Sequence, residues 1–255
     1  MKLSKLSIKT LKDNFYKLSN KTYLTITNGL SGVDQRYYLT LGLKKISYWQ
    51  DVNIFDTIDN KKELFNMVVE IPETKKLKLE LSKDEEYNPI KPDTKKDKNN
   101  NIICREYGIE PIFNYGFFPQ TYESKQNKYR NLYYGDDDPL DVVEIGGNQN
   151  LNPGDIIKVR MIGCFCLIDQ GEVDWKVIVV NDKLYNKVNK INYFDNIKKI
   201  QEWFRTYKVY EGKKENMLLD NNKIFTVEET IDVIEECRKE YKEYMMKLMN
   251  GILRS

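Results

Sequence analysis

An acidic segment at residues 136–141 has the clearest chemical potential in the sequence, because it carries four aspartates within six residues. Such closely spaced like charges repel one another, and a solvated turn is one interpretation. Two features favour a cation site instead. Pro139 stiffens the segment, and the apolar strand expected at 142–145 draws Asp141 toward the core, where an unpaired charge is costly. An EF-hand calcium loop is excluded, because Asp141 stands where that loop requires Gly and Gly147 where it requires Glu.

Two acid–base pairs elsewhere in the chain add to this signal. Asp174 and Lys176 are two residues apart on an expected strand, so their side chains leave the same face while Trp175 points into the core. Lys78 and Glu80 repeat the pattern on another expected strand. Alternating charges on a strand face are typical of a solvated surface, so these pairs predict a site only if several of them converge.

The composition limits which chemistry is available. The 255 residues include 41 Lys plus Arg against 39 Asp plus Glu, and the resulting net charge of +2 gives no field that would attract nucleic acid or an anionic membrane. No apolar run reaches the roughly 18 residues of a membrane span. The absence of histidine excludes Ser-His-Asp and Cys-His catalysis as well as His-ligated zinc. Any catalysis must therefore use carboxylates, lysines, tyrosines and metal ions.

The cysteines and the N-terminal segment bear on the compartment. Cys164 and Cys166 share one face of an expected strand, and no pair of cysteines has CxxC spacing, so we expect core thiols in a reducing, cytoplasmic protein. Residues 1–20 are basic and lack the apolar core of a secretory signal. We expect this extension to be a solvated tail or a first strand, with import into an organelle as the alternative.

Short segments rich in β-branched and aromatic residues predict a first part built from strands. The expected strands are Tyr23–Thr27, Arg36–Leu43, Phe65–Ile71, Leu77–Leu81, Val142–Ile145, Asp155–Ile168 and Asp174–Val180. The polar stretches Asn88–Asn101 and Tyr122–Gly135 are expected to be exposed loops.

Helical periodicity follows at the end of the chain. It predicts a helix over Phe194–Tyr207 and a second, amphipathic helix within 226–250, which a capping box of Thr226 and Glu229 would open. We therefore expect one domain over residues 1–255, mainly β with α, in which a strand-built barrel is followed by a helical end that packs on it.

These segments together resemble the soluble family I inorganic pyrophosphatases, and the longer eukaryotic members more than the short bacterial ones. Collinear motifs carry the resemblance from about Tyr37 to Asn216: Phe65–Pro72, Lys78-Leu79-Glu80, Asn114-Tyr115-Gly116, Phe118–Thr121, the D-x-D-P-x-D signature at 136–141, Asp174-Trp175-Lys176, and Glu202–Arg205 with Tyr207-Lys208. The resemblance implies a five-stranded OB-like β-barrel with flanking helices. It also implies hydrolysis of pyrophosphate to two phosphates.

The same resemblance implies a set of metal ligands. Asp136, Asp141 and Asp174 would hold the tightest magnesium ion, and Glu80 and Asp169 would help to hold further ions. Several Mg²⁺ ions would bind in each active site, with Mn²⁺ as a substitute. Carboxylate oxygens are hard ligands of the kind that Mg²⁺ prefers.

The remaining site residues are implied in the same way. Asp138 would be the general base that accepts the proton of a metal-activated water, and Glu70 matches another active-site carboxylate. The phosphate-binding residues would be Lys78, Tyr115, Lys176, Tyr207 and Lys208. Pyrophosphate is an anion, so it can enter a pocket lined by carboxylates only if metal ions outweigh their charge locally.

The chain departs from the family pattern at three places. The family arginine ahead of the Asn-Tyr-Gly motif corresponds to Asn100 without gaps, whereas Arg105 is the nearest arginine, and the choice stays open. A family tyrosine is replaced by Pro111. Each of these two residues contacts phosphate in the family, and the loss of each contact would weaken substrate binding by about 1.5–3 kcal/mol. Glu73-Thr74 replaces the Arg-Trp pair that is implicated in the family's dimer contact, so a homodimer is less secure than catalysis.

A binding protein that kept the barrel is the rival hypothesis. OB-like barrels bind nucleic acid through basic, aromatic faces, whereas the matched positions here are acidic. A non-catalytic descendant would be expected to lose its carboxylate set first. We therefore predict an enzyme that acts on pyrophosphate, with no nucleic-acid or membrane partner, and we leave its action on longer polyphosphates open.

Overall fold

The computed structural model describes residues 23–29, 32–55, 64–147, 150–186 and 193–251, so the basic extension at 1–20 lies outside the described residues. The strands are β1 (Tyr23–Asn28), β2 (Arg36–Leu41), β3 (Lys44–Ile46), β4 (Phe65–Ile71), β5 (Leu79–Leu81), β6 (Ile90–Pro92), β7 (Thr94–Lys96), β8 (Ile102–Cys104), β9 (Asn114–Phe117), β10 (Lys128–Tyr129), β11 (Tyr133–Gly135), β12 (Asp141–Glu144), β13 (Ile156–Asp169), β14 (Glu172–Asn181) and β15 (Met217–Leu218). The helices are α2 (Tyr193–Thr206) and α3 (Val227–Met249), with 3₁₀ turns η2 (Tyr207–Glu211) and η3 (Leu219–Asn221). Within the described part of the chain, no helix is both long and apolar enough to cross a membrane.

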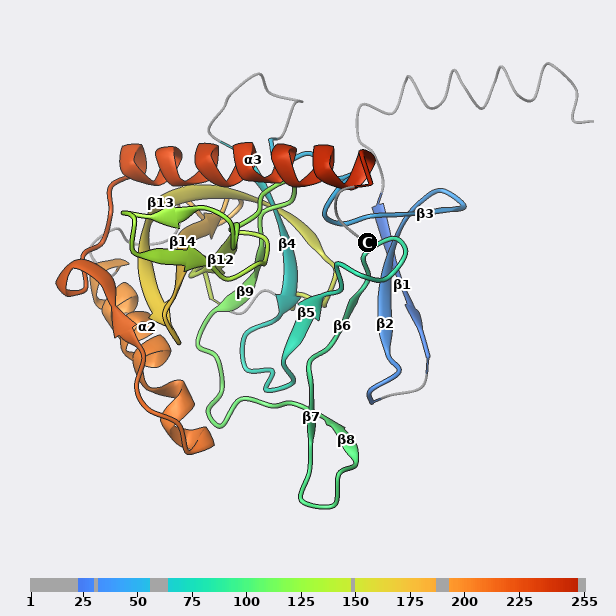
Figure 1. The fold of residues 1–255 in the computed structure, drawn as a ribbon, viewed down its shortest axis with the longest axis horizontal. Coiled ribbons are helices and arrows are strands. Elements are labelled where there is room, and N and C mark those ends of the chain that lie inside the picture. The colour runs from blue at the N-terminus through green and yellow to red at the C-terminus, as the bar shows by residue number, and fades with distance from the viewer. Residues whose placement is uncertain (1–22, 30–31, 56–63, 148–149, 187–192, 252–255) are drawn as a thin grey trace, which may run out of the picture.

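Five strands close into a ring in the order β4, β9, β12, β14, β13 and back to β4 (Figure 1). The long strand β13 closes the ring, because Ile156–Val159 pairs with β4 and Val159–Asp169 pairs with β14. A shift in register between Met161 and Gly163 bends β13 between its two partners. This ring confirms the expected five-stranded barrel and the mainly β fold with flanking helices.

A smaller sheet of β1, β2, β3, β5 and β6 lies beside the barrel, and the β7–β8 hairpin projects away from it (Figure 1). The expectation that Asn88–Asn101 is an exposed loop is wrong for its first part. Ile90 is fully buried in β6, which pairs with β5 and, through Tyr37, with β2. The apolar residue Ile90, between Pro89 and Pro92, lies in a short buried strand, and the hairpin that follows is exposed.

The second expected loop, Tyr122–Gly135, is also wrong at its start. Tyr122 and Glu123 are buried, and the segment then forms the paired strands β10 and β11. Gly135 lies so close to the backbone of Glu123 that a Cβ atom would sit 2.4 Å from the carbonyl carbon of that residue. This close approach holds the segment against the barrel wall instead of leaving it in solvent.

Both faces of the barrel wall are buried, and the side-chain period of two decides which residue faces which helix. Phe165 and Leu167 on β13 belong to the cluster that includes the apolar face of α2. Cys164 and Cys166, one position away, belong to the cluster that includes Ile234 of α3. The prediction that these two cysteines are core residues is confirmed, and both are free thiols.

The two helices confirm the predicted helical end and lie against different parts of the barrel (Figure 1). At the start of α3, Thr226 accepts from the backbone N–H of Glu229 and donates its own N–H to the Glu229 carboxylate, which is the expected capping box. Ile231 is exposed, although its spacing from Ile234 is helical. The buried residues are Thr230, Ile234, Cys237 and Tyr241.

Candidate active site

Lys176 is the central cation of the site. It lies on β14, is 2% exposed, and its ammonium contacts the carboxylates of Asp141 and Asp174 and donates to the Tyr115 hydroxyl over 3.0 Å. The register of the barrel creates this arrangement, because Asp141 on β12 is the direct partner of Lys176 on β14, and β9 brings Tyr115 alongside β12. Burial alone would lower the pKa of Lys176, but Asp141 and Asp174 outweigh it and raise that pKa. Lys176 is therefore a buried ammonium ion.

A compact acidic cluster adjoins Lys176. Glu123, Asp136 and Asp174 each place a carboxylate oxygen within 4.8 Å of the others. Burial raises the pKa of Asp174 to about 7 against the opposing effect of Lys176, and burial together with the neighbouring carboxylates raises the pKa values of Glu123 and Asp136 well above their ordinary range. The Oε2 atom of Glu123 is buried without a hydrogen-bond partner. Such a cluster requires either bound protons or a cation.

Glu123 was missed by the sequence reasoning. Its segment was expected to be an exposed loop, and its position just after the matched motif Phe118–Thr121 was the only signal that could have found it. In the structure its Oε1 atom accepts from the backbone N–H of Trp175 over 3.1 Å, which fixes the carboxyl beneath β14.

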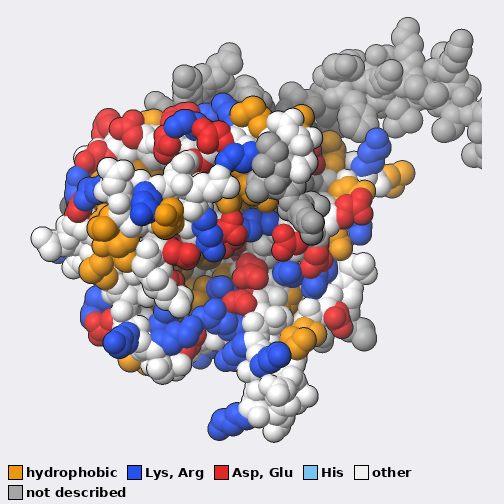
Figure 2. All heavy atoms as spheres, viewed as in Figure 1, with side chains coloured by type: hydrophobic (Ala, Val, Ile, Leu, Met, Phe, Trp, Pro, Cys, Tyr) orange, Lys and Arg blue, Asp and Glu red, His pale blue; other side chains and the backbone are white. Residues whose placement is uncertain are grey.

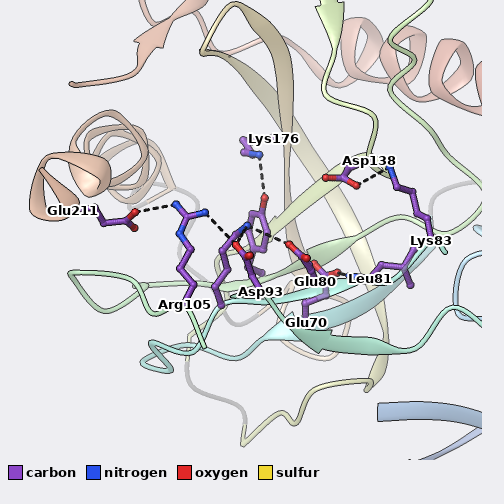
Figure 3. A network of polar contacts seen from close by, with 11 residues as sticks. Glu70, Glu80, Leu81, Lys83, Asp93, Arg105, Asp138, Lys176 and Glu211 are labelled. Atoms are coloured by element: carbon purple, nitrogen blue, oxygen red, sulfur yellow. Dashed lines mark hydrogen bonds and ion pairs between the residues drawn. The ribbon is translucent and has the colours of Figure 1, made fainter. Parts of the chain in front are cut away.

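A second group of charges surrounds Lys78, which directly precedes β5. The Lys78 ammonium lies 2.8 Å from Asp93 Oδ2 and 3.5 Å from Glu80 Oε2 (Figure 3). Glu70 lies beneath this group and accepts from the backbone N–H of Leu81 over 2.7 Å. Burial, followed by the nearby carboxylates, raises the pKa of Glu70 well above its ordinary value. Glu70 is thus a buried carboxyl group that ties β4 to β5.

The two candidate arginine positions lie in different places in the structure. Arg105 Nη1 lies 3.1 Å from Asp93 Oδ2, the oxygen that also binds Lys78, and Arg105 Nη2 lies 2.9 Å from Glu211 Oε2 (Figure 3). Asn100 lies instead in the exposed turn of the β7–β8 hairpin. Arg105, and not Asn100, is therefore placed beside Lys78.

A third group comes from the η2 turn. Lys208 is 4% exposed, and its ammonium contacts the carboxylate of Asp169 at the end of β13. The Tyr207 ring lies edge-on to the ring of Tyr107, with 5.5 Å between centroids. Burial raises the pKa of both tyrosines, so each is a neutral phenol that can donate a hydrogen bond. Tyr107 was also missed by the sequence reasoning, and it is buried against Tyr207.

The three groups belong to one charged region. Burial raises the pKa of Glu80, and Asp138 acts on that carboxyl in the same direction. Asp169 likewise adds to the burial that raises the pKa of Asp174. Figure 2 shows acidic side chains near the middle of this face, with Lys and Arg side chains around them. The acid–base pairs of the sequence therefore converge, as a functional site requires.

The turn at 136–138 completes the region. Asp137 has a left-handed backbone, with φ of 74°, and its carboxylate accepts from the Tyr122 hydroxyl. Lys83, another residue that the sequence reasoning missed, lies 3.1 Å from Asp137 Oδ2 and 3.1 Å from Asp138 Oδ1, and Figure 3 shows its contact with Asp138. The side chain of Asp138 is 58% exposed and that of Asp137 is 42% exposed, so Asp138 is the more accessible of the two to solvent.

Comparisons with known proteins agree with this geometry. A family model described as inorganic pyrophosphatase matches residues 67–242. The inorganic pyrophosphatase of Kluyveromyces lactis is 38% identical over 231 residues, which cover 87% of this chain and 77% of that protein. The crystal structure of the type I inorganic pyrophosphatase from Toxoplasma gondii has a TM-score of 0.78 at 30% identity, covering 88% of this chain and 100% of that one. The N-terminally truncated vacuolar soluble pyrophosphatase of Trypanosoma cruzi, solved in complex with PPi, has a TM-score of 0.78 at 29% identity, covering 88% of this chain and 92% of that one.

Proposed function

Because the chain belongs to the inorganic pyrophosphatase family, as one of its eukaryotic-type members, we propose distinct roles for the charged side chains of its site. The protein is an inorganic diphosphatase, a hydrolase whose substrate is pyrophosphate. The observation that carries the proposal is the buried meeting of Asp141 and Asp174 on one ammonium, next to the cluster of Glu123 and Asp136.

Divalent metal ions fit this donor set. Asp136 and Asp174 would hold the tightest Mg²⁺ ion together with Asp141, which lies beside them on Lys176, and Glu123 is an additional candidate because its Oε2 atom is buried without a partner. Carboxylate oxygens alone suit Mg²⁺, and they also accept Mn²⁺. When bound, the metal supplies positive charge that makes a water more acidic and offsets the charge of the phosphates.

Two more carboxylates lie where they can hold further ions. Glu80 is paired with Lys78 at 3.5 Å, and Asp169 is paired with Lys208. Each carboxylate therefore already stands beside a cationic residue of the substrate site. The arrival of an anionic substrate draws these lysines to its own oxygens, and the released carboxylates are then free to hold cations that come with the substrate.

The substrate phosphates are bound by the cationic and phenolic side chains around the carboxylates. Arg105 presents a planar guanidinium next to the Lys78 ammonium, which suits a phosphate that can accept from both. Burial, followed by the nearby carboxylates, raises the pKa of Tyr115, so its hydroxyl stays protonated and donates. The full phosphate-binding set is Lys78, Arg105, Tyr115, Lys176, Tyr207 and Lys208, with Glu70 as the buried acid that supports Lys78 and Glu80 from below.

Asp138 accepts the proton of the attacking water. Its carboxylate is the most exposed of the turn, so water reaches it, and only one of its oxygens contacts Lys83. The neighbouring Asp136 and Asp141 are turned toward the buried cluster and Lys176 instead. A general base of this kind contributes about 10²- to 10⁴-fold to the rate.

One assay with three variants tests these roles. Purified protein should release phosphate from pyrophosphate when magnesium is present and stop when excess chelator is added. Asp138→Asn should lose about 10²-fold or more in kcat with little change in the magnesium requirement, whereas Asp136→Ala should raise that requirement. Asp195→Asn, an exposed carboxylate at the start of α2, is the matched control. Unchanged metal dependence in Asp136→Ala would refute the ligand assignment, and full turnover in Asp138→Asn would refute the base.

The oligomeric state stays a prediction. Glu73-Thr74 stands where the family dimer contact is expected, and Thr74 is held in a left-handed conformation, φ 68°, by a backbone hydrogen bond to Pro111. We expect any homodimer to use other contacts. Size-exclusion chromatography with light scattering measures the mass, and a Glu73→Arg/Thr74→Trp double variant tests whether the missing pair strengthens the association.

A further inference from the structure

Lys83 is a largely buried cation at the exposed edge of the site. It follows β5, and its ammonium lies 3.1 Å from Asp138 Oδ1 (Figure 3) and 3.1 Å from Asp137 Oδ2. The Lys83 side chain is 15% exposed, whereas those of Asp137 and Asp138 are 42% and 58% exposed. An ordinary surface ion pair would have all its members in solvent. Here the lysine side chain is largely shielded from water, whereas the two carboxylates that it contacts are partly exposed to solvent.

Asp137 is fixed from several sides. One carboxylate oxygen accepts from the Tyr122 hydroxyl and the other contacts Lys83. Its backbone N–H donates to the Glu123 carbonyl over 2.9 Å, and its φ of 74° gives the turn a sharp reversal. Asp137 and Tyr122 thereby form a rigid anchor for the Lys83 ammonium.

Two lysines contact different carboxylates of the site. Lys176 contacts Asp141 and Asp174 in the buried part of the site, whereas Lys83 contacts Asp138 at the exposed edge. Without a cation beside it, the Asp138 carboxylate would be repelled by its neighbours in the same segment and would turn toward solvent or toward the nearest metal ion. Contact with Lys83 through Oδ1 leaves Oδ2 free in one defined orientation.

We propose that Lys83 is a positioning residue, which holds Asp138 through Oδ1 so that Oδ2 is presented to the attacking water and is not recruited as a metal ligand. This inference rests on the proposed role of Asp138 as the general base. Burial by itself would lower the pKa of Lys83, but Asp138 and Asp137 outweigh it and raise that pKa, so the ammonium stays charged throughout the neutral range.

Steady-state kinetics of Lys83→Met test the proposal. At saturating magnesium we expect kcat to fall about 10- to 100-fold, because a misplaced catalytic group costs up to about 10²-fold. The KM for pyrophosphate and the half-saturating magnesium concentration should stay within about 3-fold of their original values, since no substrate or ligand contact is removed. Lys83→Arg should recover most of the turnover, because its guanidinium can contact both carboxylates. Lys96→Met, on the exposed strand β7, is the matched loss of a positive charge.

A purely structural lysine would give a different pattern. It would lower the urea midpoint together with the activity, and arginine would not restore kcat. Unchanged kcat in Lys83→Met, or a loss that appears in KM or in the magnesium requirement, would overturn the proposal. If methionine prevents folding, Lys83→Gln takes its place with an intermediate loss of kcat expected, and wild-type turnover in that variant would overturn the proposal equally.

The double variant Lys83→Met/Asp138→Asn separates this inference from the proposed function. If Lys83 acts through Asp138, its replacement has no further effect once Asp138 is replaced. A loss of the same size in both backgrounds would mean that Lys83 acts independently, which contradicts the inference alone. An active Asp138→Asn protein would instead contradict the proposed base, and the positioning role would fall with it.

Discussion

Replacing Lys176 by methionine should destabilise the metal-free protein by an amount that depends on pH. The side chains of Lys176, Asp141 and Asp174 are only 3%, 14% and 10% exposed, so solvent screens these ion pairs little. Removing one partner of a buried pair costs about 3–5 kcal/mol, because the remaining charge is left uncompensated. Burial raises the pKa of Asp174 to about 7, so this carboxyl takes up a proton at small cost near neutrality. We therefore expect the lower end of that range, about 3 kcal/mol, at pH 8.

The sign of the pH dependence follows from the same carboxyls. Below about pH 6 Asp174 is protonated in the folded state, and it then needs the ammonium less. The loss in Lys176→Met should accordingly be smaller at pH 6 than at pH 8. Saturating magnesium should recover part of the loss at pH 8, because ions that bind only the folded state stabilise it by mass action.

Urea unfolding of the wild-type protein and the variant measures these differences, in chelator and in magnesium at both pH values. Lys96→Met, an exposed lysine on β7, should stay within about 0.5 kcal/mol of the wild type. An unfolding free energy equal to that of the wild type at pH 8 in chelator would show that the ammonium does not hold the carboxylates. A loss that is larger at pH 6 would refute the charge assignment.

Four further predictions concern metal binding, stability against pH, substrate binding and the fold. Magnesium binding at pH 6.5 should release one or more protons, because burial raises the pKa of Asp174 to about 7 and raises the pKa values of Glu123 and Asp136 well above their ordinary range, and calorimetry in buffers of different ionisation enthalpy measures this release. In chelator, the same carboxyl adds stability below its unfolded pKa that is lost as the pH rises through about 7, so urea midpoints should fall over that interval. Arg105→Met should raise the KM for pyrophosphate about 10-fold or more while Lys96→Met leaves it unchanged, and equal KM values would remove Arg105 from the substrate site. Gly116→Ala should cost more than about 4 kcal/mol or prevent folding, because its Cβ would lie 1.8 Å from the Val68 carbonyl oxygen, and a urea unfolding free energy within about 1 kcal/mol of the wild type would contradict this close approach.

Local patterns in the sequence predicted local features well. The period of two placed Asp174 and Lys176 on one face of β14 and Trp175 on the other, and the structure has this arrangement. The capping box at Thr226 and the helix that follows it were also visible, because both depend on residues within one turn of each other. The strand β9 was missed, since a segment containing Asn114 and Gly116 has low strand propensity and becomes a strand only by pairing with β4 and β12.

The positions at which the chain departs from the family pattern needed the structure. Arg105 and Asn100 are close in sequence, but the β7–β8 hairpin carries Asn100 outward and returns the chain at Arg105 to the side of Lys78. No motif or spacing in the sequence distinguishes Lys83 from the other lysines. Its contact with the 136–138 turn joins segments that are far apart along the chain, and no spacing in the sequence encodes that distance.

The sequence by itself determined the kinds of groups available: carboxylates and lysines without histidine, the strand and helix periods, and the motif order that identifies the family. Only the tertiary structure decided which of these groups meet. Pairing Asp141 with Lys176 depends on the register between β12 and β14, and the closure of the ring by β13 fixes how deeply Glu123, Asp136 and Asp174 are buried. Burial in turn sets their protonation, because the energy of a carboxylate depends on the water and charges around it and not on its neighbours along the chain.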